Sequence, residues 1–162
     1  MDSVDICLFS PDDSTLVTVS SGNGHASVWS TEDWSLTRIL GRESLHFFSS
    51  VLFSPEGSVL VTMSEVPFEY DTYMQVWRTE DWHLLNAARI GDRSKAHLFS
   101  PDGRFLVTGD GGGAARVWDI TTLEELDLLA GHIGSVAACD FDRTNGTLRI
   151  VNSAKCLEVW AD

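Results

Sequence analysis

The most informative part of the sequence is residues 99–119, which read FSPDGRFLVTGDGGGAARVWD. The Ser-Pro-Asp-Gly part is typical of a hairpin turn, because Pro fixes φ and Gly or Asp accepts a positive φ. The Phe-Leu-Val-Thr part that follows is rich in aromatic and β-branched residues, which favour a strand. A glycine-rich turn then leads to a second strand ending on Val-Trp. The segment predicts short strands separated by tight turns.

The same pattern occurs four times along the chain. Related turn sequences begin at Phe9, Phe53, Phe99 and Phe141, and each copy ends on a Val-Trp pair containing Trp29, Trp77, Trp118 or Trp160. The tryptophans are separated by 48 residues (29 to 77), 41 residues (77 to 118) and 42 residues (118 to 160). This period lies in the range of propeller repeats. No segment longer than a turn shows helical periodicity, so the sequence predicts an all-β fold.

These units resemble WD40 repeats over the whole chain, with Trp118-Asp119 and Gly131-His132 as the closest matches to the family pattern. The resemblance implies a β-propeller segment in which each repeat builds one four-stranded blade. The expected blades cover residues 1–46, 47–92, 93–132 and 133–162. The last blade lacks its outer strand, which gives about fifteen antiparallel strands. It should expose an edge strand near residues 157–160.

Family blades often join a His, a Ser or Thr of the second strand, the Trp and a turn Asp through hydrogen bonds. Only repeat four keeps the His, as His132. Repeat three keeps Thr108 and Trp118, but Asp92 stands where the His would be and Gly112 replaces the turn Asp. We therefore expect no complete network, and blades that are held mainly by apolar packing.

The ends of such a blade stack need covering, because blade-to-blade faces are apolar. An open stack of four would expose two such faces. Three arrangements remain open: the chain is part of a larger propeller, two copies join head to tail as a homodimer closing an eight-bladed ring, or four blades close on themselves. Contacts between neighbouring repeats would cover the ends in the first two arrangements.

Composition points to a folded chain with a strongly acidic surface. The formal net charge is −13, which repels phosphate backbones and anionic lipids, so neither a nucleic acid nor a membrane is expected as a partner. Residues 1–5 lack the features of a signal peptide, which favours a cytoplasmic location. The cysteines show no zinc or disulfide spacing, and Cys7 and Cys139 are expected at inward strand positions as core residues.

The sequence contains no recognisable catalytic, cofactor or metal motif. It has no P-loop, no HExxH and no GxSxG sequence. Residues 110–113 read Asp-Gly-Gly-Gly, but they lie between two strands and are interpreted as a tight turn. His97 lies on an expected innermost strand, where it either lines the channel or has a structural role. We therefore predict a protein that is not an enzyme and that needs no cofactor.

Aromatic residues gather in two loops of repeat two, residues 42–48 and 65–74. In the propeller that the resemblance implies, both loops emerge on the same side of the ring. They would form a partner-binding surface consisting of Leu45, His46, Phe47, Phe68, Tyr70 and Tyr73. Aromatic side chains with a polar rim are common in binding hot spots. The alternative is an insertion whose aromatic residues pack against one another.

Two identical turns form a second candidate, because Thr-Glu-Asp-Trp occurs at residues 31–34 and again at residues 79–82. Trp34 and Trp82 either cover the edges of their blades or form a ledge for a peptide. Taken together, the sequence predicts a non-catalytic scaffold for protein–protein interaction that binds a protein or peptide. The alternative is a regulatory or sensor segment of a larger signalling ATPase or kinase.

Overall fold

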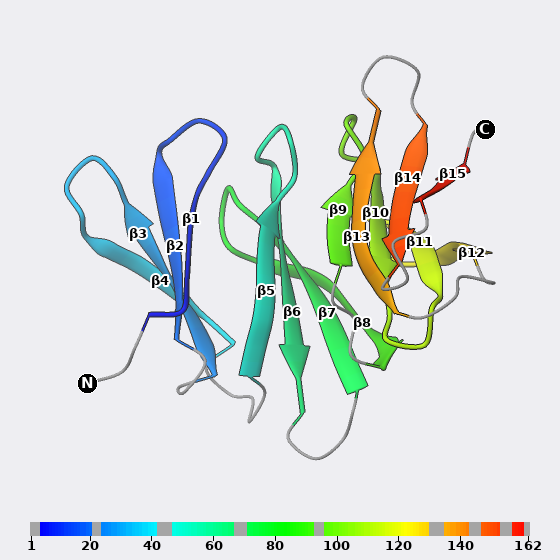
Figure 1. Ribbon diagram of the computed structural model, residues 1–162. Coiled ribbons are helices and arrows are strands. Elements are labelled where there is room, and N and C mark those ends of the chain that lie inside the picture. The colour runs from blue at the N-terminus through cyan, green and yellow to red at the C-terminus, as the bar shows by residue number, and fades with distance from the viewer. Residues whose placement is uncertain are drawn as a thin grey trace. The chain divides into compact units, whose positions relative to one another are not determined.

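The structure is a computed structural model that describes residues 4–20, 24–41, 47–66, 71–92, 96–129, 135–142, 147–152 and 157–160. Within these ranges every regular element is a β-strand (Figure 1). There are fifteen strands in four antiparallel sheets, and in every sheet the strand order follows the chain order. The predicted all-β propeller segment is confirmed.

The sheets follow one another along the sequence. Blade one contains β1 (Ile6–Phe9), β2 (Thr15–Ser20), β3 (His25–Ser30) and β4 (Leu36–Leu40). Blade two contains β5 (Phe47–Phe53), β6 (Val59–Glu65), β7 (Asp71–Arg78) and β8 (Leu84–Asp92). Blade three contains β9 (Ala96–Phe99), β10 (Phe105–Gly109), β11 (Ala115–Asp119) and β12 (Glu125–Leu129). Blade four contains β13 (Val136–Phe141), β14 (Leu148–Asn152) and β15 (Leu157–Trp160), with β15 at the edge of its sheet.

The repeated Ser-Pro turns join the first two strands of blades one, two and three. In blade one the Ser10 amide donates to the Thr15 carbonyl at 2.9 Å, and Ser54 and Ser100 make the equivalent bonds in blades two and three. The fourth turn residue has a positive φ each time, as Asp13, Gly57 and Gly103. Local sequence therefore fixes both the turn and the register of the strands that flank it.

The chain forms two compact units, residues 1–89 and 90–162. In the first unit, blades one and two share an apolar cluster. Blade one contributes Val17, Val19, Ala26, Val28 and Leu40 to this cluster, and blade two contributes Phe48, Val51, Leu60 and Trp77. All nine side chains are buried. Burial of each large aliphatic side chain contributes about 1.5–3 kcal/mol, so this contact is the main source of stability in the first unit.

The second unit repeats this arrangement with blades three and four. Its cluster consists of Ala96, Val107, Ala115 and Leu129 from blade three and Val136, Leu148 and Ile150 from blade four. Gly109 lies at the closest approach, because a Cβ atom there would lie 2.4 Å from Cγ1 of Val136. Apolar packing between neighbouring blades is therefore a feature of both units.

The structure corrects one prediction about the core. Cys7 was expected at an inward position, but its side chain is exposed, whereas Cys139 is partly buried. Cys7 pairs with Thr18, so its side chain lies on the opposite face of blade one from Val17 and Val19. That second face does not pack against blade two. The alternating pattern identified a face of the sheet, but the face has no neighbouring blade in the first unit.

Candidate functional site

The predicted partner-binding surface lies at one end of blade two. Phe47 begins β5 and pairs with Glu65 at the end of β6, and Glu65 pairs with Thr72 near the start of β7. Thr72 is fully buried, whereas Phe47 is 44% exposed. An exposed aromatic ring in register with a buried residue at a sheet end is a feature expected of an interaction surface.

Tyr73 lies at the same end of blade two but on the other face of the sheet. It pairs with Ser64, which also pairs with Phe48, so Tyr73 shares a face with those residues and not with Phe47. Its side chain is partly buried. Four other residues of the predicted surface, Leu45, His46, Phe68 and Tyr70, lie outside the described residues. The six-residue surface therefore stays a prediction.

The end of blade two also carries an ion pair. The Arg89 guanidinium on β8 donates to the Asp71 carboxylate at the start of β7 at 2.5 Å. Asp71 is largely buried and Arg89 is mostly exposed, so solvent screens the pair and limits what it contributes to stability. The amide of Val66 donates to the Asp71 carbonyl, which closes the hairpin between β6 and β7. This closure brings Glu65 and Asp71 to the same end of the sheet.

The first three blades share a hydrogen bond between the repeat tryptophan and a threonine of the second strand. The indole nitrogens of Trp29, Trp77 and Trp118 donate to the hydroxyls of Thr18, Thr62 and Thr108 at 2.9, 3.1 and 2.9 Å. From the sequence, only the third pair was predicted. Aligning the repeats on Val-Trp would have revealed Thr18 and Thr62. Each threonine lies two residues after the cross-strand partner of its tryptophan and therefore on the same face of the sheet.

The glycine-rich turn of blade three is anchored by a carboxylate, and the sequence pattern did not predict this role. Asp110 accepts the amides of Gly112 and Ala114, each at 2.9 Å, and its second oxygen accepts from Arg116 at 2.7 Å. Arg116 also approaches Glu125 at 3.4 Å. The prediction that Gly112 replaces the turn Asp is therefore incomplete, because Asp110 supplies the carboxylate from two residues earlier. The turn is structural, as predicted.

The identical Thr-Glu-Asp-Trp turns have the same backbone but different surroundings. Trp34 and Trp82 have φ values of 59° and 58°, and Leu123 has 56° at the same position in blade three. A bulky residue in the left-handed region is an outlier that costs roughly 1–2 kcal/mol. Trp82 packs against the cluster between blades one and two, whereas Trp34 is 59% exposed. The two tryptophans therefore form no common ledge.

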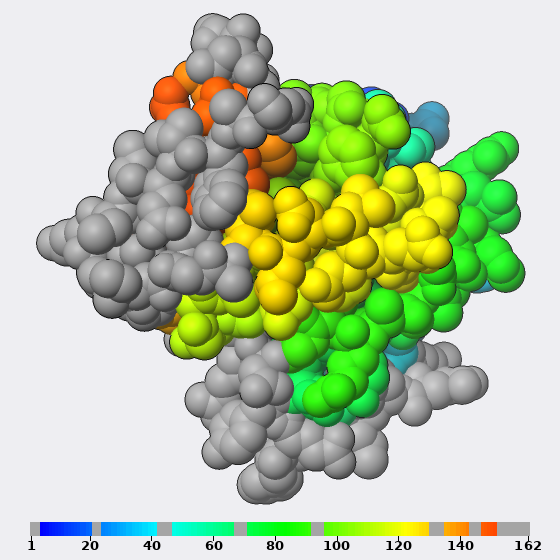
Figure 2. Space-filling view, turned by 90° about the vertical axis from the view of Figure 1, so that its right-hand side faces the viewer, coloured from blue at the N-terminus to red at the C-terminus, as the bar shows by residue number. Residues whose placement is uncertain are grey.

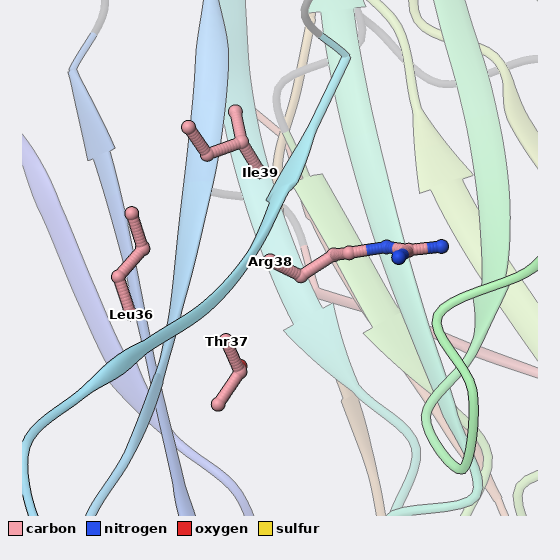
Figure 3. A pocket seen from close by; sticks show the side chains of 4 residues that line it. All are labelled: Leu36, Thr37, Arg38 and Ile39. Atoms are coloured by element: carbon pink, nitrogen blue, oxygen red, sulfur yellow. The ribbon is translucent and has the colours of Figure 1, made fainter.

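A shallow hollow of about 410 Å³ lies along the edge strand β4, which comes shortly after Trp34 in the sequence. It is lined by Leu36, Thr37, Arg38 and Ile39 (Figure 3). Thr37 donates to the Val28 carbonyl at 3.0 Å. The outer strand β12 of blade three, yellow in Figure 2, also lies at the surface, and its Leu126 is 52% exposed. Exposed leucines are thus common to the outer strands.

Two titratable groups are shifted by burial. Desolvation lowers the pKa of His97 to about 4, so its imidazole is neutral at pH 7, and its buried Nε2 atom has no hydrogen-bond partner among the described residues. Desolvation also raises the pKa of the Cys139 thiol to about 11. Neither shift has a charged neighbour as its cause. Among the described residues, no three His, Cys, Asp or Glu side chains are arranged to hold a metal ion.

Repeated antiparallel sheets, apolar blade-to-blade packing and the Trp–Thr bond shared by three blades define a repeat protein of the propeller class. Residues 94–119 match the family model described as "WD domain, G-beta repeat". The sheets of blades one and two have the strand order and the turns of this matched repeat, and the three strands described for blade four follow the same order. Residues 94–119 are therefore a WD40 repeat, and the chain as a whole is similar to WD40-repeat proteins.

Several characterised proteins are similar to parts of the chain. A probable serine/threonine-protein kinase, PkwA of Thermomonospora curvata, is 38% identical over 80 residues, which are 48% of this chain and 11% of that protein. WD repeat-containing protein 62 of Sus scrofa is 40% identical over 57 residues, 34% of this chain and 4% of that protein. Mitogen-activated protein kinase-binding protein 1 of Mus musculus is 42% identical over 57 residues, again 34% and 4%. The chain thus spans a small fraction of each relative.

The described residues include no helix with the length and apolar character that a membrane span requires. WD40 repeats are an architecture for binding proteins, and the rigid sheets of this chain fit that general role.

Proposed function

We propose that the chain is a non-catalytic, cytoplasmic docking platform that holds a protein or peptide at the loop end of blade two. The proposed contact surface is the end of the sheet, with Phe47 on one face and Tyr73 on the other. The predicted loop residues Leu45, His46, Phe68 and Tyr70 complete it. The observation that carries the proposal is the exposure of Phe47 in register with fully buried Thr72. A rigid sheet end that presents an exposed ring loses little conformational entropy when a partner binds.

Charge gives the surface a preference among partners. The chain has a net charge of −13, and Glu65 pairs directly with Phe47 at this end of the sheet. An acidic rim around an aromatic centre favours segments that combine an apolar side chain with Lys or Arg, because opposite charge speeds encounter and aids selection. The name of the kinase-binding relative from mouse adds protein kinases to the partner classes that we propose.

The regulatory alternative, in which the chain is the sensor segment of a signalling ATPase or kinase, is weaker. Its support is the match to PkwA, which covers 11% of that protein. This match covers about half of this chain, and no further observation favours the alternative over a docking platform. A homodimer that closes an eight-bladed ring, or completion by the remaining blades of a longer chain, are the assemblies compatible with the proposal.

A random-peptide phage library panned on the immobilised chain tests the proposal. The affinity of the selected peptide is then measured by fluorescence polarisation for the natural chain and for Phe47→Ala, Phe68→Ala and Tyr73→Ala. We expect Phe47→Ala to weaken binding by about tenfold, the typical effect of removing a hot-spot ring. The thermal midpoint should stay nearly unchanged, because the Phe47 ring is exposed.

Leu126→Ala on β12 is the matched control, because it removes an equally exposed apolar side chain from another blade. It should leave peptide affinity unchanged. Selected peptides that bind all three loop variants as tightly as the natural chain would refute the site. Unfolding of Phe68→Ala and Tyr73→Ala would show that the loop aromatics belong to the core.

A further inference from the structure

The outer strands of blades one and three follow matched turns but carry opposite charges. Trp34 and Leu123 occupy the same turn position, and the residues four places later are Arg38 and Asp127. Each of these is the cross-strand partner of the valine in its Val-Trp pair. Glu125 adds a second carboxylate to β12, whereas β4 contains no acidic residue. The edge of β4 is therefore positively charged in a chain whose net charge is −13.

Arg38 differs from the other arginines that the structure describes. Four of them form ion pairs with aspartates, and these are Arg78, Arg89, Arg116 and Arg149. Arg104 lies over the ring of Phe105. Arg38 is exposed and forms no ion pair within the described ranges. Because a guanidinium stays charged at pH 7 and binds carboxylates through two parallel hydrogen bonds, Arg38 is available to a carboxylate of a partner.

The side chains of β4 separate into an apolar side and a cationic side. Leu36 and Ile39 extend from one side of the strand and Arg38 extends from the other (Figure 3). Leu36 pairs with Trp29, which pairs with Leu16, so these three residues share a face of blade one. This face does not pack against blade two and is hereafter called the open face. A segment running along β4 would thus meet apolar side chains on the open face and a cation on the other side.

The outer edge of β4 has main-chain groups without a partner in its sheet. β4 is the last strand of blade one and pairs there with β3 alone. Its β-bulge and the charge of Arg38 oppose pairing with an arbitrary strand, which is how exposed edges avoid aggregation. A strand that places a carboxylate beside Arg38 removes the second obstacle. The edge is therefore selective for an acidic segment.

Trp34 adds an exposed aromatic ring close to this edge in the sequence. It lies two residues before Leu36, which is 46% exposed, and its own side chain is 59% exposed. The backbone of Trp34 is strained, with a φ of 59°. In blade two the same strain is offset, because Trp82 packs against the apolar cluster. An exposed indole, an exposed leucine and an arginine together have the composition of a binding hot spot.

We propose that the edge of β4 is a docking site for an extended acidic segment of a partner protein, in which an Asp or Glu residue lies between apolar residues. The segment adds as a strand beside β4, and its carboxylate binds the Arg38 guanidinium. Its apolar side chains occupy the hollow against Leu36 and Ile39. Main-chain hydrogen bonds supply affinity, and the two kinds of side chain supply selectivity. The inference does not depend on the loop end of blade two, which favours segments containing Lys or Arg.

Paired phage selections test the inference. A library of short peptides with randomised apolar and charged positions is panned on the natural chain and on Arg38→Glu. We expect the natural chain to enrich peptides with Asp or Glu between apolar residues, and Arg38→Glu to enrich Lys or Arg at that position. Equal enrichment of acidic peptides by both chains would overturn the inference. So would a selection on the natural chain that contains no acidic peptides.

The affinity of the enriched acidic peptide, measured by fluorescence polarisation, identifies the residues that bind it. Arg38→Ala should weaken binding by about tenfold, and the difference should shrink at high salt because exposed charges are screened. Trp34→Gly should also weaken binding. This variant removes backbone strain, so it should fold, and circular dichroism verifies this for both variants. An unchanged affinity in Arg38→Ala would overturn the inference.

Two control variants keep this site separate from the rest of the surface. Asp127→Ala changes the matched position of β12, and Phe47→Ala changes the loop end of blade two. Both should bind the acidic peptide as tightly as the natural chain. A loss in either control as large as that in Arg38→Ala would place the peptide away from β4.

The alternative occupant is a second copy, because β12 itself carries Asp127 between Leu126 and Leu128. Light scattering over a range of concentrations distinguishes the two. A mass that neither Arg38→Ala nor Asp127→Ala changes supports a separate partner. A dimer that both substitutions convert to a monomer would show that β12 of another copy occupies the edge, and would overturn the assignment.

Discussion

Blades one and two have nearly the same sequence pattern but differ in what covers them. Leu16 and Leu60 occupy one register position, yet Leu16 is partly exposed and Leu60 is fully buried. Trp34 and Trp82 end identical tetrapeptides, yet only Trp82 packs against the apolar cluster. The difference shows that burial in a repeat protein is decided by the neighbour and not by the residue.

The largest expected difference between the two blades comes from a buried charge. Leu60→Asp should lower the free energy of unfolding by about 4 kcal/mol or more, because the carboxylate has no partner in the cluster. Leu16→Asp should cost about 1 kcal/mol, because water reaches the open face. Urea unfolding followed by circular dichroism measures both. Equal losses would mean that the open face is covered in solution.

A methyl group between the blades tests how tightly blade one covers blade two. Gly41 has a φ of +77°, and a Cβ there would lie 2.6 Å from Cζ of Phe48. Gly41→Ala should therefore cost about 2 kcal/mol through backbone strain and a displaced ring. Gly111→Ala is the control, because no atom lies within 4 Å of its added Cβ. Differential scanning calorimetry should show a lower midpoint for the first variant alone.

The same substitution should change the stability of the chain in opposite directions at Trp34 and Trp82. Glycine adopts the left-handed region without strain, so Trp34→Gly should raise stability by about 0.5 kcal/mol. Trp82→Gly removes the same backbone strain but also removes packing against the cluster, so it should lower stability by about 1.5 kcal/mol. Thermal unfolding measures the sign. A loss in Trp34→Gly would show that the exposed indole already has a contact in solution.

The smallest difference is expected for the Trp–Thr hydrogen bonds. Thr62→Val leaves the buried Trp77 indole without its acceptor and should cost about 1 kcal/mol. Thr18→Val should cost less than half of that, because Trp29 is partly exposed and water can replace the hydroxyl. Chemical denaturation of both variants makes the comparison, and identical losses would contradict it.

The sequence predicted more of the fold than of the site. The four repeats, the strands and the Ser-Pro turns were all identified from local patterns. Cys7 was misplaced, because an alternating strand pattern marks two faces without saying which face has a neighbour. Asp110 was overlooked as the anchor of its turn, because its role depends on amides and on Arg116, which the folded hairpin brings around it. For the six-residue surface, the structure places Phe47 and Tyr73 on opposite faces of the sheet.

By itself, the sequence determined the all-β repeat architecture of this WD40-like chain, because turn residues and a two-residue alternation act over a few neighbouring positions. The tertiary structure decided which blade faces are covered, and it showed that Leu16 and Trp29 lie open where Leu60 and Trp77 are packed. It also showed that Asp140 and Arg149 lie on the side of blade four that faces away from the cluster shared with blade three. The physical reason is that burial is a property of two surfaces in contact, and a single strand's pattern contains only one of them.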